Sequence, residues 1–154
     1  MPTLFDTLEG IAALPDADLH GRRDELRATL LQAGEVVMES WLRAQHLPPT
    51  DDRHEGFRLL ALQRQGARQD PSFNACRESC RELVYQCNAA AAAAADTPAA
   101  SAEHLRLGAH VAMHLALFID GKLENSRLGE FCCAARPLRA RDDAASAAAP
   151  TQPA

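Results

Sequence analysis

The sequence predicts an all-α fold: a single-domain helical bundle of about four main helices, with short accessory helices and a disordered C-terminal tail. Two observations carry this prediction. Apolar residues recur every three or four positions along most of the 154-residue chain, which is the spacing of one face of an α-helix. Aromatic residues make up only 5% of the chain. The core must therefore consist largely of Leu, Val, Ala and Met, which suit packed helices better than a β-sandwich.

The first main helix is predicted over residues 19–47. Its apolar positions recur at spacings of three, four or seven and so form one stripe. Pro48 and Pro49 are expected to end it, because proline lacks the backbone N–H and disfavours helical geometry in the residue before it. A short accessory helix is expected before it, over residues 3–14, ending at Pro15. The stripe consists of Leu19, Leu26, Leu30, Ala33, Val37, Trp41 and Ala44.

The second main helix is predicted over residues 52–65. Asp52 and Glu55 have the spacing of a capping box, in which each side chain satisfies a free backbone donor of the other residue. Gly66 is expected to end this helix, because glycine readily adopts the left-handed conformation found after helix C-termini.

The third main helix is predicted over residues 71–95. Asp70 is its expected N-cap and Pro71 its first helical residue. The helix runs into seven consecutive alanines, Ala89 to Ala95. Alanine is the best helix former, so this tract extends the helix or stands as a tolerated low-complexity insertion.

The fourth main helix, over residues 101–119, has a competing interpretation. Leu105 to Ile119 alternate apolar and other residues as a strand would, and Asp120-Gly121 is a favoured hairpin turn. We expect a helix, because fifteen residues are long for a strand and Leu, Ala and Met favour helices. A helix that is apolar nearly all round belongs in the centre of a bundle or at an oligomer interface.

The remaining segments complete the predicted organisation. A short final helix is expected over residues 124–135, which gives a helical domain of residues 1–135. Residues 136–154 are rich in Arg, Ala, Asp, Ser and Pro, so we expect a disordered tail. No apolar run is long enough to span a bilayer, and no secretory signal is visible, so the expected location is cytoplasmic. The net charge of −5 argues against a nucleic-acid partner.

Several common motifs are absent from the sequence. It contains no G-x-G-x-x-G or phosphate loop, no G-x-S-x-G elbow, no Glu-x-x-His pair and no C-x-x-C. His54 and Glu55 begin an H-E-x-x-H pattern, but Arg58 occupies the fifth position and cannot complete a zinc site. Neither nucleotide binding nor a familiar catalytic class is therefore indicated.

One metal site is a candidate. Cys76 and Cys80 are four residues apart, as are His110 and His114, so each pair points the same way from its predicted helix. If the two helices pack face to face, two sulfurs and two imidazoles could converge on zinc. Cys87 lies on the same stripe as an additional possible ligand, and three thiolates would suit copper(I). The alternative is that the cysteines and histidines simply pack in the core.

A second candidate site is a redox handle at Cys132-Cys133. Adjacent residues on a helix point about 100° apart, so at most one of these thiols faces the core. Arg136 nearby could lower the pKa of the exposed thiol. The five cysteines cannot all pair internally, which fits free thiols in a reducing compartment.

These observations lead to three functional hypotheses. The first is a non-enzymatic interaction or regulatory module, expected to form a homodimer through an apolar helix face or to bind another protein. The second is a metal-binding or thiol-based sensor that uses the cysteine and histidine pairs. The third is an enzyme with Cys/His chemistry, which no local motif supports.

Overall fold

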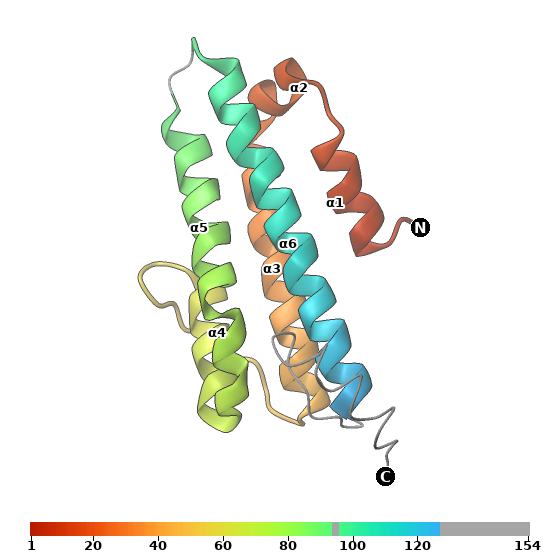
Figure 1. The fold of residues 1–154 in the computed structure, drawn as a ribbon. Helices are drawn as coiled ribbons and strands as arrows, with labels where there is room; N and C mark the ends of the chain where they lie inside the picture. Colours follow the sequence, from red (N-terminus) through yellow and green to blue (C-terminus); the bar gives the residue numbers. More distant parts are fainter. Residues whose placement is uncertain (94–95, 127–154) are drawn as a thin grey trace. The chain divides into compact units, whose positions relative to one another are not determined.

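A computed structural model describes residues 1–93 and 96–126 of the chain, and these residues form helices and no strand (Figure 1). The chain divides into two compact units, residues 1–117 and 118–154. None of the described helices is long and apolar enough to cross a membrane. The elements in order are α1 (Leu4–Ala12), α2 (Asp16–Gly21), α3 (Arg23–Ala44), α4 (Arg58–Gln69), the 3₁₀ helix η1 (Pro71–Cys76), α5 (Arg77–Ala92) and α6 (Pro98–Ser126).

The core of the first unit forms around α3, against which the other helices pack. At Gly34 in the middle of α3, side chains of Leu59 from α4 and Leu83 from α5 approach so closely that a Cβ atom would lie 3.1 and 3.0 Å from them. Gly108 of α6 meets Leu30 of α3 in the same way, at 3.1 Å. Helices lacking a Cβ at the crossing approach more closely than bulky side chains would allow. These glycines therefore mark where α4, α5 and α6 contact α3.

The N-terminal helices are fastened to α6 by one arginine. Thr3 and Asp6 form a capping box that begins α1. At the other end of α1, Arg106 of α6 donates from Nε to the Ala12 carbonyl at 3.2 Å and from Nη2 to the Leu14 carbonyl at 2.7 Å. The same Nη2 lies 2.7 Å from Oδ1 of Asp16 at the start of α2. One side chain thus satisfies the carbonyls where α1 ends and holds the first residue of α2.

The helix predicted over residues 19–47 is shorter than expected at both ends. The helix is interrupted between α2 and α3 at Arg22, whose backbone is not helical. At the other end α3 stops at Ala44, before the prolines. His46 is left-handed with φ 61°, and the Leu47 N–H bonds to the Leu42 carbonyl at 2.9 Å. This is a Schellman arrangement, which ends helices without proline.

The predicted capping box at Asp52 is wrong. Residues 54–57 instead form a tight turn in which His54 and Phe57 exchange two backbone hydrogen bonds of 3.0 Å each. Glu55 and Gly56 both have positive φ, 54° and 88°, as a type I′ turn requires. The helix α4 begins only after this turn.

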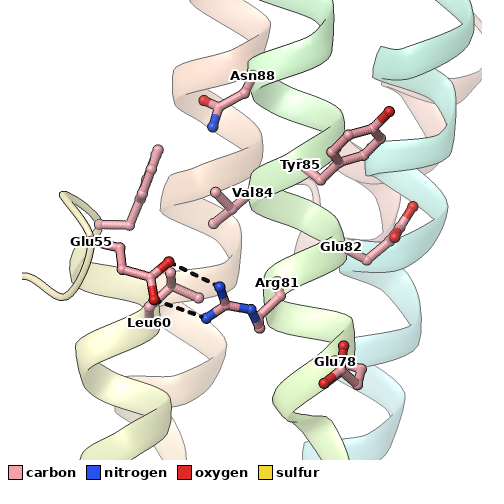
Figure 2. Close-up of a pocket in the computed structure, with 9 residues that line it drawn as sticks. Glu55, Leu60, Glu78, Arg81, Glu82, Val84, Tyr85 and Asn88 are labelled. Atoms are coloured by element: carbon pink, nitrogen blue, oxygen red, sulfur yellow. Dashed lines mark hydrogen bonds and ion pairs between the residues drawn. The ribbon is translucent and has the colours of Figure 1, made fainter.

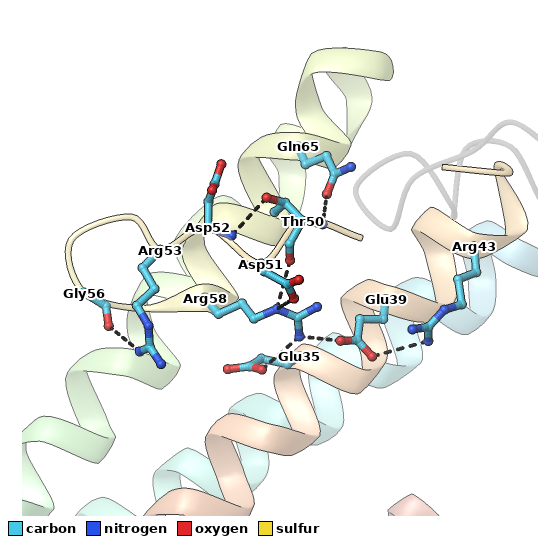
Figure 3. A network of polar contacts seen from close by, with 10 residues as sticks. All are labelled: Glu35, Glu39, Arg43, Thr50, Asp51, Asp52, Arg53, Gly56, Arg58 and Gln65. Carbon is cyan, nitrogen blue, oxygen red and sulfur yellow. Dashed lines mark hydrogen bonds and ion pairs between the residues drawn. The ribbon is translucent and has the colours of Figure 1, made fainter. Parts of the chain in front are cut away.

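A polar network ties the start of α4 and the loop before it to α3 (Figure 3). Arg58 donates to Glu35 at 3.2 Å and also to Glu39, both on α3. Its Nε donates to the Thr50 carbonyl at 2.9 Å. The Thr50 N–H in turn donates to Gln65 of α4 at 2.9 Å. The loop is therefore held by side chains rather than by secondary structure.

The prediction that Gly66 ends the second main helix is wrong. Gly66 lies inside α4, which continues to Gln69. A Cβ at Gly66 would lie 2.6 Å from the ring of Phe73, so glycine makes room for that side chain. The Phe73 ring stacks on Trp41 of α3 with centroids 5.8 Å apart. The Asp70 cap is confirmed, because its side chain accepts from the Ser72 N–H at 3.1 Å. The first turns after it are 3₁₀ rather than α.

The alternating segment 105–119 is helical, as predicted, and α6 continues through Asp120-Gly121 to Ser126. Its inner positions within the first unit are small or aliphatic, and the larger Leu107 and Leu117 are 41% and 61% exposed. Helix α5 ends at Ala92, within the alanine tract. The predicted tail at 136–154 and nearly all of the predicted helix at 124–135 lie outside the described residues.

Candidate functional site

The three cysteines near α5 are core residues. Cys76, Cys80 and Cys87 are free thiols, at most 2% exposed. The Cys76 thiol donates to the Phe73 carbonyl at 3.2 Å. A side-chain hydrogen bond with Cys76, and then burial, raises the pKa of Cys80 well above its ordinary value. Burial raises the pKa of Cys87 to about 12. The last two thiols are therefore protonated and poorly nucleophilic at neutral pH.

The histidines predicted to meet those cysteines lie elsewhere. His110 and His114 are on the exposed side of α6. Among the described residues, no group of three or more His, Cys, Asp or Glu side chains is placed to hold a metal ion. The structure thus does not bring the predicted zinc or copper(I) ligands together. The redox prediction at Cys132 and Cys133 lies outside the described residues.

The two histidines line a groove between α5 and α6. The groove has a volume of about 420 Å³. Helix α6 contributes an apolar and imidazole wall, and α5 contributes an acidic wall, each with the four-residue spacing that places side chains on one face. The lining residues are Glu78, Ser79 and Glu82 of α5 and Leu107, His110, Val111 and His114 of α6.

One end of this region is ordered by contacts between α5 and α6. Nδ1 of His104 lies 2.7 Å from Oε1 of Gln86. The exposed Tyr85 ring meets His104 edge to face, with centroids 6.4 Å apart. Gln86 also donates to Glu82 at 2.6 Å. The acidic wall of the groove is thereby linked to α6 through a chain of polar contacts.

A second hollow shares Glu78 and Glu82 of α5 with this groove and extends toward α4 and the 54–57 turn (Figure 2). Its volume is about 490 Å³. Glu55 points from the turn at Arg81 of α5 and accepts two hydrogen bonds, of 2.9 and 3.4 Å. The Arg81 hydrogen bond is the main reason why the pKa of Glu55 is lower than its ordinary value, and the charges of Arg81, His54 and Arg64 add to it.

Beside this ion pair lies a smaller, basic pocket of about 320 Å³. Arg64 reaches it from α4, while Arg77 and Arg81 reach it from α5. Nε2 of His54 lies 3.4 Å from Arg64 and 3.2 Å from the Glu55 carboxylate. Leu60 and Gln63 complete the lining. Positive charge from two helices is therefore concentrated in one place on a chain whose net charge is −5.

Little in the sequence indicated this basic pocket. Arg77 and Arg81 alternate with Glu78 and Glu82, which suggests a solvated face with ion pairs between neighbours. Arg77 does pair with Glu78 at 3.0 Å, but Arg81 pairs with Glu55, which is 26 residues away. The Glu-Gly dipeptide was the available signal for the turn. No protein-family model, curated protein or solved structure matches this chain.

Proposed function

We propose that this chain is a non-enzymatic interaction module that forms a homodimer through the groove between α5 and α6. The observation that carries this proposal is the composition of the groove: an acidic row and a histidine row face each other across apolar side chains. The three free, buried thiols support a reducing location such as the cytoplasm.

A second copy of the chain fits this surface because the surface is self-complementary. In a two-fold dimer each patch meets the same patch of its partner, so both halves of every favourable pair must lie on one chain. Glu78 and Glu82 of one copy can meet His110 and His114 of the other, and the reverse pairs form at the same time. The exposed Leu107 and Leu117 supply apolar surface along α6.

The first test is sedimentation velocity of the full chain from low to high micromolar concentration. We expect a concentration-dependent dimer that Leu107→Glu abolishes, because a charge at the centre of an apolar contact is costly to desolvate. Val36→Glu is the matched control: Val36 is 44% exposed on α3 and lines none of the three hollows described above. A wild-type chain that stays monomeric over the whole range refutes the proposal.

A charge exchange tests the pairing itself. One variant carries Glu78→Lys and Glu82→Lys, and the other carries His110→Glu and His114→Glu. Each variant alone should be monomeric, because its own rows repel across the interface. Mixed together they should form a heterodimer, in which lysines face glutamates on one side and the native rows meet on the other. No recovery on mixing would contradict the proposed pairing of acidic and histidine rows.

A further inference from the structure

We infer that the basic pocket between α4, α5 and the 54–57 turn binds the phosphate group of a small phosphorylated molecule. The pocket shares no lining residue with the proposed dimer groove, although Glu78, the ion-pair partner of Arg77, lines that groove. The inference rests on the convergence of three guanidinium groups on one cavity.

The charge of the pocket matches a phosphate group. Three arginines and one glutamate line it, which leaves an excess of two positive charges when His54 is neutral. A phosphate monoester carries a charge of roughly −1.5 to −2 at neutral pH. Its oxygens accept hydrogen bonds from planar guanidinium donors, which bind oxyanions in a forked geometry. A ligand of this class would therefore balance the pocket.

Arg64 is the arginine of the pocket whose charge is least neutralised by its neighbours. Within the part of the chain that the structure describes, no carboxylate lies within ion-pair distance of its guanidinium, and its nearest polar partner is His54 at 3.4 Å. Among the described residues Arg77 pairs with the neighbouring Glu78 alone, whose side chain is 81% exposed and does not line the pocket. Such exposed pairs are weak, so both arginines are available to an incoming anion.

Glu55 and its turn hold the third arginine in place. Glu55 has a left-handed backbone with φ 54°, a conformation that is unfavourable for a residue with a side chain. That conformation directs the carboxylate at Arg81 (Figure 2), whose side chain is 37% exposed. Strained non-glycine residues concentrate at binding sites, where the surrounding structure maintains them. Glu55 thus orients Arg81 at the edge of the pocket, and no ion pair joins it to Arg64 or Arg77 in the described part of the chain.

The size of the pocket favours a small ligand. A volume of 320 Å³ lies at the lower end of the range of about 300–1,000 Å³ found for small-molecule sites. Leu60 lines both this pocket and the larger hollow next to it, so the organic part of a monoester can extend over Leu60 toward Phe57. We therefore expect phenyl phosphate to bind more tightly than inorganic phosphate.

The test is isothermal titration calorimetry of the full chain with inorganic phosphate, phenyl phosphate and succinate at low ionic strength. Arg64→Gln should weaken phenyl phosphate binding about tenfold, because it removes a charge-assisted hydrogen bond. Arg77→Gln should also weaken it. Glu55→Gln should strengthen it several-fold, because the opposing charge in the lining is gone. Arg68→Gln, an exposed arginine of α4 that does not line the pocket, should leave it unchanged.

Circular dichroism of each unliganded variant confirms that the fold is intact, and Arg64 and Arg77 are both exposed enough for substitution. Absence of saturable phosphate binding would overturn the inference, as would equal weakening by Arg64→Gln and Arg68→Gln. Succinate binding as tightly as phenyl phosphate would overturn the assignment to phosphate. Because the pocket is separate from the α5–α6 groove, Leu107→Glu should bind phosphate normally whether or not the dimer exists.

Discussion

Gly66 offers a test of packing in which two effects of known size oppose each other. Substitution by alanine inside a helix should stabilise it by about 0.8–1 kcal/mol, because glycine loses more backbone entropy on folding. At Gly66, however, the new Cβ would lie 2.6 and 2.7 Å from two carbons of the Phe73 ring. That ring is fully buried and stacked on Trp41, so it cannot move away freely. Overpacking of this kind costs about 1–3 kcal/mol.

The net expectation for Gly66→Ala is a loss of about 1 kcal/mol in the free energy of unfolding. Gly10→Ala in α1 is the matched control, because nothing lies within 4 Å of a Cβ placed there. It should stabilise the protein by up to about 1 kcal/mol. The two variants should therefore differ by about 2 kcal/mol, or about 4–8 °C in Tm for a chain of this size.

Urea denaturation followed by far-UV circular dichroism and by Trp41 fluorescence measures both variants. The two probes should agree, since Trp41 lies in the same core as the substitution. If Gly66→Ala is as stable as Gly10→Ala, the close approach of Phe73 is absent in solution and the packing described for α4 and η1 is wrong.

Two other predictions concern the polar network and a buried thiol. Arg58→Ala should lower the free energy of unfolding by about 2 kcal/mol, because Glu35 and Glu39, whose side chains are only 20% and 14% exposed, lose their shared partner. Arg43→Ala, which removes an arginine that is 65% exposed from the same Glu39, should change it by less than about 0.5 kcal/mol; equal effects in urea denaturation would contradict this account. The raised pKa of Cys87 means that the neutral thiol is favoured in the folded state, so stability is full below the ordinary pKa of 9.0 and declines as the pH rises toward 12. Between pH 9 and pH 12 the free energy of unfolding of Cys87→Ala should fall by up to about 4 kcal/mol less than that of the wild type. If the two proteins lose stability in parallel above pH 9, the pKa of Cys87 is not raised in the folded state.

The fold was largely predictable because the apolar stripes of α3, α4 and α5 face the core as periodicity requires. The helix start at Asp70-Pro71 was also predictable, since its signal is local. The predicted helix boundaries were wrong where two local signals competed. Asp52 and Glu55 have capping-box spacing, but Gly56 permits a tight turn, and the hydrogen bonds from Arg58 to α3 favour a late helix start. The role of Gly66 was not predictable, because it depends on the ring of Phe73, seven residues later.

The candidate site was much harder to predict than the fold. On α6 the inner residues are largely alanines, while leucines lie on both faces, so hydropathy does not say which face is buried. His110 and His114 could therefore be placed on a common face but not oriented. The Glu55–Arg81 contact joins residues 26 positions apart, and such pairs follow from helix packing rather than from spacing. The predicted cysteine positions, by contrast, agree with core packing.

The hydrogen bonds that Arg106 donates at the α1–α2 junction can form only late in synthesis. Its two carbonyl partners precede it by 94 and 92 residues, so both have left the ribosome well before Arg106 has been synthesised. Until Arg106 has been made, these contacts are missing and the two carbonyls are satisfied by water. The α1–α2 junction therefore gains these contacts only after α6 has been made, so it stays accessible to other proteins for longer than a junction held by its sequence neighbours.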